Sequence, residues 1–275
     1  MNSAQNAPHT EIQCARHIFD HLGKEKIERH CHSMYELIYI LKGDGTYIVE
    51  GMEYPLHPNT LFLLRPYEYH YVCPKKPQPY ERIVINFDST LLPDVLQNHP
   101  MLSEQRGNYF SVSDSQSPLR SALNTLSGMI PFPEKSTKED HDVGVVLLCA
   151  TVTQILLLLT MQKPIENNFE NSGTVLRVIE YLNQHLKEDI SLDTLARDFF
   201  ISKYHLCRIF RQQTGASIFT YFNTKRIALA QQMIAEGESA TAVAKQLGFQ
   251  DYSAFYRAYR RQTGAPPIRQ RSTIK

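Results

Sequence analysis

The sequence predicts a multidomain α+β protein with an N-terminal β-barrel, a pair of helices behind it and an all-α C-terminal domain with two helix-turn-helix motifs. Three observations predict this arrangement. Short β-rich runs fill residues 30–90, helical periodicity replaces them from Pro118 onward, and the C-terminal part repeats itself. The length of 275 residues suits about two domains, and a hydrophobic content of 42% is enough to form real cores.

The predicted barrel occupies residues 1–117. Four β-rich runs, 36–42, 46–50, 61–64 and 81–87, are separated by glycine- and proline-containing segments. The first two flank a short Gly-Asp-Gly segment, which predicts a β-hairpin. Short strands at this spacing are typical of a small barrel or jelly roll.

Two helices, at 119–130 and 138–161, are expected in a helical region 118–162, followed by a polar linker at 163–172 and a helical domain at 173–275. The run Val143–Met161 is apolar and long enough to cross a bilayer, yet it contains Gln154 and lacks basic anchors. We therefore expect no membrane partner. A helix buried on most sides, between domains or at a dimer interface, is favoured. A dimer formed through Val143–Leu159 is expected to depend on Leu156 and Leu159 as contact residues.

Charge divides the chain into two unlike halves. Residues 173–275 hold 15 Lys or Arg and 8 Asp or Glu, whereas residues 1–172 hold 14 basic and 20 acidic residues. A basic half suggests contact with a polyanion. The five cysteines are scattered and odd in number, and no signal-like N-terminal segment is present. The predicted location is the cytoplasm.

An internal repeat carries the strongest functional signal. Residues 191–216 and 239–265 align, with Arg208 matching Arg257 and Gly215 matching Gly264. The single extra residue of the second copy falls in the turn, at Gln250. Each copy has a short helix with a small alanine, a tight turn and a capped second helix, which is the pattern of a helix-turn-helix.

The second helix of each copy has an apolar back and a basic, polar front. A helix that enters the DNA major groove needs this arrangement. The connecting helix, from about residue 218 to 235, spans roughly 27 Å at 1.5 Å per residue. Successive major grooves lie about 34 Å apart, so one chain could read two of them. An ordinary helical bundle with a solvated basic face is the alternative.

The repeat resembles the DNA-binding domain of the AraC/XylS family of transcription regulators. The resemblance rests on stretches such as Ile201–Leu206, Arg208–Gly215 and Val243–Phe249. One departure is Phe200, where the family usually has glycine and where the angle between the first two helices could change. The resemblance places DNA contacts on Ser202, Lys203, Tyr204, His205, Cys207, Arg208, Arg211, Tyr252, Ser253, Tyr256, Arg257 and Arg260.

The N-terminal half resembles the first cupin motif through His30, His32 and Glu36, with His70 on a later strand. Residues i and i+2 of a strand share a face, so the two first histidines point the same way. The family resemblance implies that these four residues bind a small-molecule effector. The same residues would be the ligands of a divalent metal, although we expect no metal and no cofactor.

The sequence thus favours a DNA-binding transcription regulator, an activator that responds to a small molecule, with a carbohydrate as the favoured effector. Double-stranded DNA, the effector, a second copy of the chain and RNA polymerase are the expected partners. We expect no enzymatic activity. The alternative is a metal-dependent cupin enzyme, an isomerase or dioxygenase, with a DNA-binding appendage.

Overall fold

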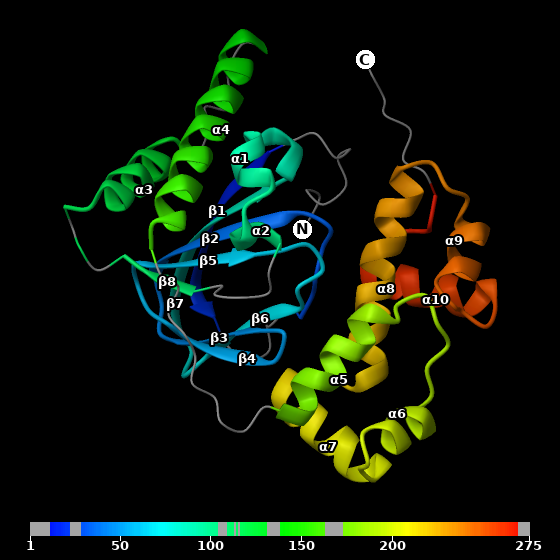
Figure 1. Cartoon of the computed structure of the whole chain (residues 1–275). Coiled ribbons are helices and arrows are strands. Elements are labelled where there is room, and N and C mark those ends of the chain that lie inside the picture. The colour runs from blue at the N-terminus through cyan, green and yellow to red at the C-terminus, as the bar shows by residue number, and fades with distance from the viewer. Residues whose placement is uncertain are drawn as a thin grey trace.

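The computed structural model describes residues 12–22, 29–103, 109–112, 114, 116–130, 138–162 and 173–268. Within them a β-barrel lies beside an all-α domain (Figure 1). Strands come first and helices afterwards, which confirms the predicted α+β class. The predicted linker 163–172 falls outside the described residues, so the domain limits remain a prediction.

The barrel consists of two antiparallel sheets. The larger sheet has the strand order β1-β7-β2-β5-β8 and the smaller sheet the order β4-β3-β6. Three of the strands, β1, β4 and β8, were not singled out by the sequence, and β6 was expected only through His70. The strands are β1 (Gln13–Leu22), β2 (Tyr35–Lys42), β3 (Gly45–Val49), β4 (Met52–Leu56), β5 (Thr60–Leu64), β6 (His70–Pro74), β7 (Gln78–Phe87) and β8 (Tyr109–Ser111).

The hairpin predicted between residues 36–42 and 46–50 is wrong. β2 pairs with β5 and β7, whereas β3 pairs with β4 and β6 in the opposite sheet. Gly43 has a φ of 129°, and this glycine-type conformation accompanies a crossing from one sheet to the other. The tight hairpin instead joins β3 to β4 through Glu50 and Gly51, whose φ values of 51° and 76° suit a two-residue turn.

The two faces of the larger sheet have different partners. Its inner face forms the barrel interior with side chains such as Ile38 and Phe62. Its outer face packs through Leu37 and Ile85 against the helices that follow the barrel. Those helices are α1 (Asp94–Gln97), α2 (Pro100–Ser103), α3 (Pro118–Gly128) and α4 (Lys138–Thr160), with a 3-10 turn, η2 (Ser89–Leu91), before them.

Helix α4 contains the apolar run noted in the sequence. The segment Asp142–Thr160 is long and apolar enough to cross a membrane by length and composition alone. Leu156 and Leu159 are 0% and 1% exposed and pack into the core beneath α3. The prediction that these two leucines form a dimer contact is therefore wrong. Only 33% of the apolar window is buried within one chain, so burial on most sides would require a further partner.

The C-terminal domain has six helices among the described residues, and they confirm the two predicted helix-turn-helix motifs. The first motif packs against one half of α8 and the second against the other half. The helices are α5 (Gly173–Gln184), α6 (Leu192–Asp198), α7 (Lys203–Thr214), α8 (Ile218–Ala235), α9 (Ala240–Gln246) and α10 (Tyr252–Thr263).

Local capping explains where these helices begin and end. Ser191 and Ser239 cap the first helix of each motif, and their hydroxyl oxygens accept from the backbone N–H of Thr194 and Ala242 at 3.0 and 3.2 Å. Gly215 and Gly264 end α7 and α10 in the left-handed conformation, with φ values of 71° and 74°. The signals at these positions are local, and the structure agrees with them.

Phe200 occupies the turn of the first motif with a φ of 54°, and Gly248 occupies the matching place in the second motif with a φ of 66°. The backbone therefore keeps the left-handed turn in both copies, whatever the residue. The Phe200 side chain is 96% exposed, so packing does not compensate for the strained conformation.

The two domains meet at the outer face of the smaller sheet. Three side chains point out of the barrel on that side and pack into the core formed by α5, α7 and the first half of α8: Ile48, Tyr69 and Tyr71. Figure 1 shows β3, β4 and β6 on the side facing the helical domain, with α3 and α4 at the opposite side of the barrel. The helical domain is thus in direct contact with the barrel.

Candidate DNA interface and effector site

The first candidate recognition helix is α7. It begins after Ser202, whose hydroxyl oxygen accepts from the backbone N–H of His205 at 3.3 Å. Leu206 and Phe210 are buried in the domain core, and the opposite face is turned to solvent. The predicted DNA-contacting residues on that face are Ser202, Lys203, Tyr204, His205, Arg208 and Arg211, all exposed, with Cys207 partly exposed.

Charged side chains on α7 differ in their partners. Lys203 forms an ion pair with Asp193 of α6, which holds it beside the turn. Arg208 donates to Nδ1 of His205 at 3.0 Å. Among the described residues, neither Arg208 nor Arg211 has an ion pair with a carboxylate. Both guanidinium groups therefore remain available for phosphates or for the O6 and N7 acceptors of guanine.

The second candidate recognition helix, α10, repeats this construction. Asp251 caps it by accepting from the backbone N–H of Ala254 at 2.6 Å. Phe255 and Tyr259 are buried against α8 and α9. The predicted DNA-contacting residues on the outer face are Tyr252, Ser253, Arg257 and Arg260, all exposed, with Tyr256 partly exposed.

Helix α8 connects the two motifs and has 18 residues. At 1.5 Å per residue it is about 27 Å long. Arg226 belongs to this helix but contacts protein: its Nε donates to the carbonyl of Leu186 at 2.9 Å, and its guanidinium lies 4.0 Å from the ring centroid of Phe222. Burial lowers the pKa of Arg226 to about 10. This arginine fixes α8 to the domain core.

The four predicted effector residues converge inside the barrel. Nε2 of His32 lies 3.0 Å from Oε2 of Glu36, and Nε2 of His70 lies 3.1 Å from the same oxygen. The rings of His30 and His70 lie 4.4 Å apart between centroids. Their backbones also pair, since the His70 N–H donates to the His30 carbonyl at 2.9 Å. Residues that are distant in sequence thus form one cluster.

The carboxylate of Glu36 organises this cluster. Burial would raise the pKa of Glu36, but the imidazoles of His70 and His32 outweigh it and hold that pKa well below its ordinary value. For His32, burial lowers the pKa, yet the charge and hydrogen bond of Glu36 raise it overall. Nδ1 of His32 also faces the carbonyl of Met34 at 3.0 Å. Both nitrogens of His32 therefore face acceptors, which favours the imidazolium form.

The same cluster could hold a divalent metal. One nitrogen from each of His30, His32 and His70 lies within 4.8 Å of the others. Nδ1 of His70 faces the carbonyl of Glu68 at 2.8 Å, so its Nε2 points into the cluster. Imidazole and carboxylate donors suit several transition metals, and they equally suit the hydroxyl groups of a sugar.

Three further polar side chains reach the barrel interior, and the sequence did not predict them as site residues: Tyr47, Tyr80 and Arg82. Tyr80 and Arg82 lie on the inner face of β7, and Tyr47 lies on β3 opposite them. The ring of Tyr47 stacks on His70 with centroids 6.2 Å apart. Alternation along β7 could have placed Arg82 inside, because it lies two residues from the apolar interior position Val84.

The segment Arg29–His32 links this cluster to the domain interface. His30 and His32 point into the barrel, whereas Cys31 is buried beside Lys225 of α8 and Glu50. Burial raises the pKa of Cys31 to about 12, which keeps it a neutral thiol. The Arg29 guanidinium lies 4.7 Å from the ring centroid of Tyr71 at the same interface. Successive residues of one short segment thus lie against the histidine cluster and against the helical domain.

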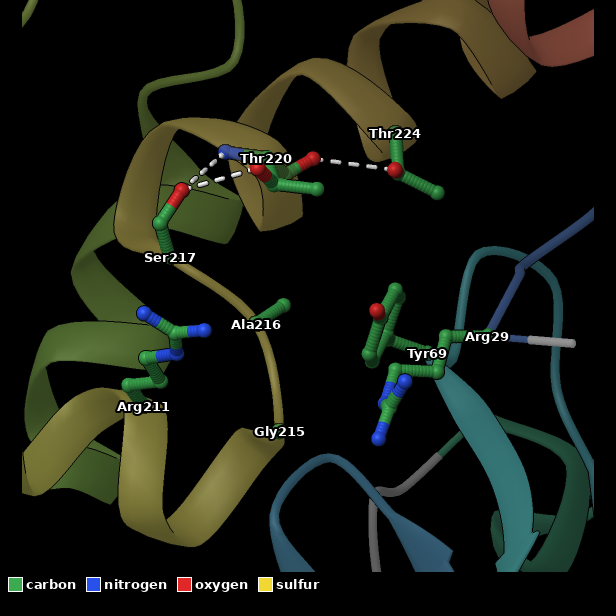
Figure 2. A pocket seen from close by; sticks show the side chains of 8 residues that line it. All are labelled: Arg29, Tyr69, Arg211, Gly215, Ala216, Ser217, Thr220 and Thr224. Carbon is green, nitrogen blue, oxygen red and sulfur yellow. Dashed lines mark hydrogen bonds between the residues drawn. The ribbon is translucent and has the colours of Figure 1, made fainter. Parts of the chain in front are cut away.

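A cavity of about 510 Å³ opens between the two domains beside this segment. Figure 2 shows Arg29 and Tyr69 on the barrel side facing the loop after α7 and the start of α8. Arg211 also lines it, so a residue of the predicted DNA interface borders the barrel. The remaining lining residues are Gly215, Ala216, Ser217, Thr220 and Thr224.

Family models match both parts of the chain. Residues 16–142 match an AraC-like ligand-binding domain, and residues 195–273 match a helix-turn-helix domain. A ligand-binding barrel joined to a double helix-turn-helix defines a transcription regulator that binds DNA and a small molecule. The chain belongs to the AraC/XylS family of transcription regulators.

Two similar proteins cover most of the chain, and a third covers one third of it. The HTH-type transcriptional activator RhaS of Escherichia coli strain SMS-3-5 is 26% identical over 252 residues, which cover 86% of this chain and 85% of the relative. ToxT of Vibrio cholerae matches 94% of this chain and 97% of that chain at 11% identity, with a TM-score of 0.41. The DNA-binding domain of AdpA, solved with a target DNA, covers 33% of this chain and 83% of that chain at 30% identity and a TM-score of 0.32.

Proposed function

We propose that this protein is a transcription activator that binds a small carbohydrate in its barrel and reads two successive major grooves with α7 and α10. One observation carries the DNA-reading half of the proposal. Two copies of the same capped helix, each with an exposed arginine-bearing face, are attached to one rigid helix, α8. The name activator follows relatives that are about one quarter identical to this chain.

The effector site of the proposal is His30, His32, Glu36 and His70. A carboxylate accepts hydrogen bonds from hydroxyl groups, and imidazoles donate or accept according to tautomer. A polyol, which carries a donor and an acceptor on each hydroxyl group, matches such a mixed set of partners. The proposal includes no catalytic role and no metal for these residues.

The signal passes through the segment Arg29–His32. A ligand that contacts His30 and His32 changes the position or mobility of their neighbours Arg29 and Cys31, which lie beside Gly215 and Lys225 of the helical domain. An effector shifts an equilibrium only when its contacts differ between two states. Here the differing contacts are those between the barrel and α8, so the effector alters how α7 and α10 are presented to DNA.

The active species of the proposal is a dimer formed by α4. Five of its exposed residues, continued by Met161 directly after the helix, recur at the spacing of four and three that is typical of a coiled-coil seam. Val143, Leu147 and Leu157 are 55%, 53% and 41% exposed, so a single chain leaves this apolar seam uncovered. A second copy would cover it with the same residues, since a two-fold interface is self-complementary. The full seam is Val143, Leu147, Ala150, Gln154, Leu157 and Met161.

The proposed activator works in the cytoplasm with RNA polymerase as its further partner. Cys14, Cys31, Cys73, Cys149 and Cys207 are all free thiols, which agrees with a reducing compartment.

Selection of genomic DNA fragments tests the function. The full chain is incubated with sheared DNA from its host, with and without a panel of sugars, and the retained fragments are sequenced. The expected result is a small set of promoter fragments with two half-sites about one helical turn apart, whose retention depends on one sugar. Retention that does not depend on sequence, or on any sugar, would contradict the proposal. A variant with Arg208→Ala and Arg257→Ala provides the matched control.

A further inference from the structure

Polar atoms inside the barrel lack hydrogen-bond partners, although solvent does not reach them. Tyr47 and Tyr80 are 0% and 2% exposed, and their hydroxyl groups find no acceptor within the described part of the chain, because their polar neighbour is the Arg82 guanidinium, which can only donate. Nε of Arg82 and Oδ1 of Asn86 also lack a partner among the described residues. Buried polar groups in native proteins are nearly always hydrogen-bonded, so such a group indicates an unseen water, ion or ligand.

These four groups share one surface. Arg82 and Asn86 lie on the inner face of β7, two and six residues after Tyr80, and Tyr47 lies on β3 of the opposite sheet. Asn86 is the register partner of Glu36, the central residue of the effector cluster. The unpartnered groups therefore adjoin the proposed effector site and extend it along β7.

The carboxylates of the barrel form ion pairs with residues other than Arg82. Glu36 is paired with His32 and His70, and Glu81 pairs outside the barrel with Arg16 and Lys42. Among the described residues no carboxylate lies within ion-pair distance of Arg82. The charge of Glu36 attracts Arg82 from beyond that distance, but this carboxylate is already paired with His32 and His70. A bound anion would give the guanidinium an ion-pair partner of its own.

The phenols beside Arg82 are donors at neutral pH. Burial raises the pKa of Tyr47 and of Tyr80, so both hydroxyl groups stay protonated. Two O–H donors and a guanidinium form a set to which a carboxylate oxygen, an acceptor only, is complementary. His17, His32 and Arg82 are each partly exposed, so a ligand can approach this end of the barrel from solvent.

We propose that the effector is a sugar acid, whose carboxylate binds Arg82, Tyr47 and Tyr80 while its hydroxyl groups bind the Glu36 cluster. The inference rests on the proposed effector function and names the chemical class of the ligand. A uronate or an aldonate has both parts, a carboxylate at one end and a polyol along the rest. A neutral sugar would leave the guanidinium unpaired.

Binding measurements on the full chain test the class of ligand. Calorimetry with EDTA-treated protein compares three matched pairs: glucuronate with glucose, galacturonate with galactose, and gluconate with glucitol. At least one acid is expected to bind, and its neutral partner is expected to bind at least about tenfold more weakly. Neutral sugars that bind as tightly as the acids would overturn the sugar-acid inference and leave the effector function standing. Absence of binding by every acid and every neutral sugar would overturn both.

Variants separate a role in binding from a role in folding. Arg82→Gln keeps a polar, hydrogen-bonding side chain, although a shorter one, and removes its charge, so affinity for the acid should fall about tenfold or more. The melting temperature of the free variant should not fall, because Arg82 has no ion pair with a carboxylate among the described residues that the substitution would break. Arg16→Gln, on the outer face of β1, is the control and should retain affinity. Unchanged acid binding by Arg82→Gln, or acid binding that needs added metal, would overturn the proposal.

Discussion

Glu50 and Lys225 form a buried ion pair that joins the barrel to the DNA-binding domain. Nζ of Lys225 lies 2.7 Å from Oε1 of Glu50. Glu50 is 9% exposed and Lys225 is 2% exposed. The Tyr221 hydroxyl and the backbone N–H of Tyr69 donate to the same carboxylate. Glu50 sits in the tight β3–β4 turn and Lys225 in the middle of α8, so this contact fixes the helix that carries both recognition helices.

The first prediction concerns this ion pair. Lys225→Met leaves the Glu50 carboxylate buried without its counter-charge, and removal of one partner of a buried pair costs about 3–5 kcal/mol. The free energy of unfolding, measured in urea, should fall by about that amount. The double variant with Glu50→Gln should recover much of the loss, because it buries no charge.

A matched lysine provides the control. Lys245→Met on α9 changes an exposed lysine and should alter the free energy of unfolding by less than about 0.5 kcal/mol. The variants with a disrupted ion pair should also bind DNA with less dependence on effector, because the barrel then restrains α8 less. Equal stabilities of the Lys225→Met and Lys245→Met variants would show that the ion pair does not fasten the domains.

The helical domain could be predicted closely because its signals are local. Ser191, Ser202 and Ser239 precede helices and cap them, and Gly215 and Gly264 end helices in the left-handed conformation. Each of these signals acts within four residues of its position. The long helix expected at 218–235 is α8, with the same bounds.

The barrel was less predictable because its contacts are distant in sequence. The Gly43–Gly45 segment looks like a hairpin turn, but the choice between pairing β2 with β3 and pairing it with β7 depends on the whole barrel. Arg82 was overlooked for a similar reason. An arginine in an alternating strand looks like a solvent-facing residue until the register shows which face is inside. His30, His32, Glu36 and His70 converge as expected, since i and i+2 geometry and strand pairing fix them.

The second prediction concerns the strained turn of the first helix-turn-helix. Phe200→Gly should raise the free energy of unfolding by about 0.5–1 kcal/mol, the left-handed strain of a non-glycine residue less the backbone entropy of glycine. The Phe200 side chain is 96% exposed, so little packing is lost. Phe200→Ala is the control, since it keeps the Cβ atom and hence the strain. Equal stability of the glycine and alanine variants would disprove this explanation.

The third prediction concerns the α4 seam. Leu147→Lys combined with Leu157→Lys should convert the dimer into monomers, because charges would have to be buried where the helices meet. Light scattering on the full chain gives the mass directly. Asn124→Lys on the exposed face of α3 is the control and should leave a dimer. A dimer that survives the double substitution would place the interface on another surface.

The fourth prediction is a pH dependence of stability that depends on Glu36. Because the pKa of His32 is raised, the pairing of His32 with Glu36 stabilises the fold fully below pH 6.5, the ordinary pKa of histidine. This stabilisation is lost as the pH rises through the raised pKa. Because the pKa of Glu36 is lowered, the pairing of Glu36 with the histidines stabilises the fold fully above pH 4.5, the ordinary pKa of glutamate. This stabilisation is lost as the pH falls through the lowered pKa. The cluster therefore contributes most between these two values.

Thermal melting in EDTA between about pH 5 and pH 8 checks the direction in which stability changes with pH. The wild type should lose more stability above pH 6.5 than Glu36→Gln, because the variant lacks the charge that raises the His32 pKa. Parallel curves for the two proteins would mean that this cluster does not set the pH dependence.

The fifth prediction separates base reading from phosphate binding by the two recognition helices. Arg208 and Arg257 occupy matching exposed positions on α7 and α10. Replacement of either by alanine removes up to two hydrogen bonds to guanine, which is worth about 1–3 kcal/mol of discrimination. Affinity for the operator should fall accordingly, while affinity for scrambled DNA should change much less. Arg177→Ala on α5 removes an exposed arginine outside both motifs and should leave operator affinity unchanged.

Titrations at several salt concentrations complete the test, because a lost phosphate contact lowers the salt slope by about one unit and a lost base contact does not. Equal losses on operator and scrambled DNA, with a reduced salt slope, would assign these arginines to the phosphate backbone.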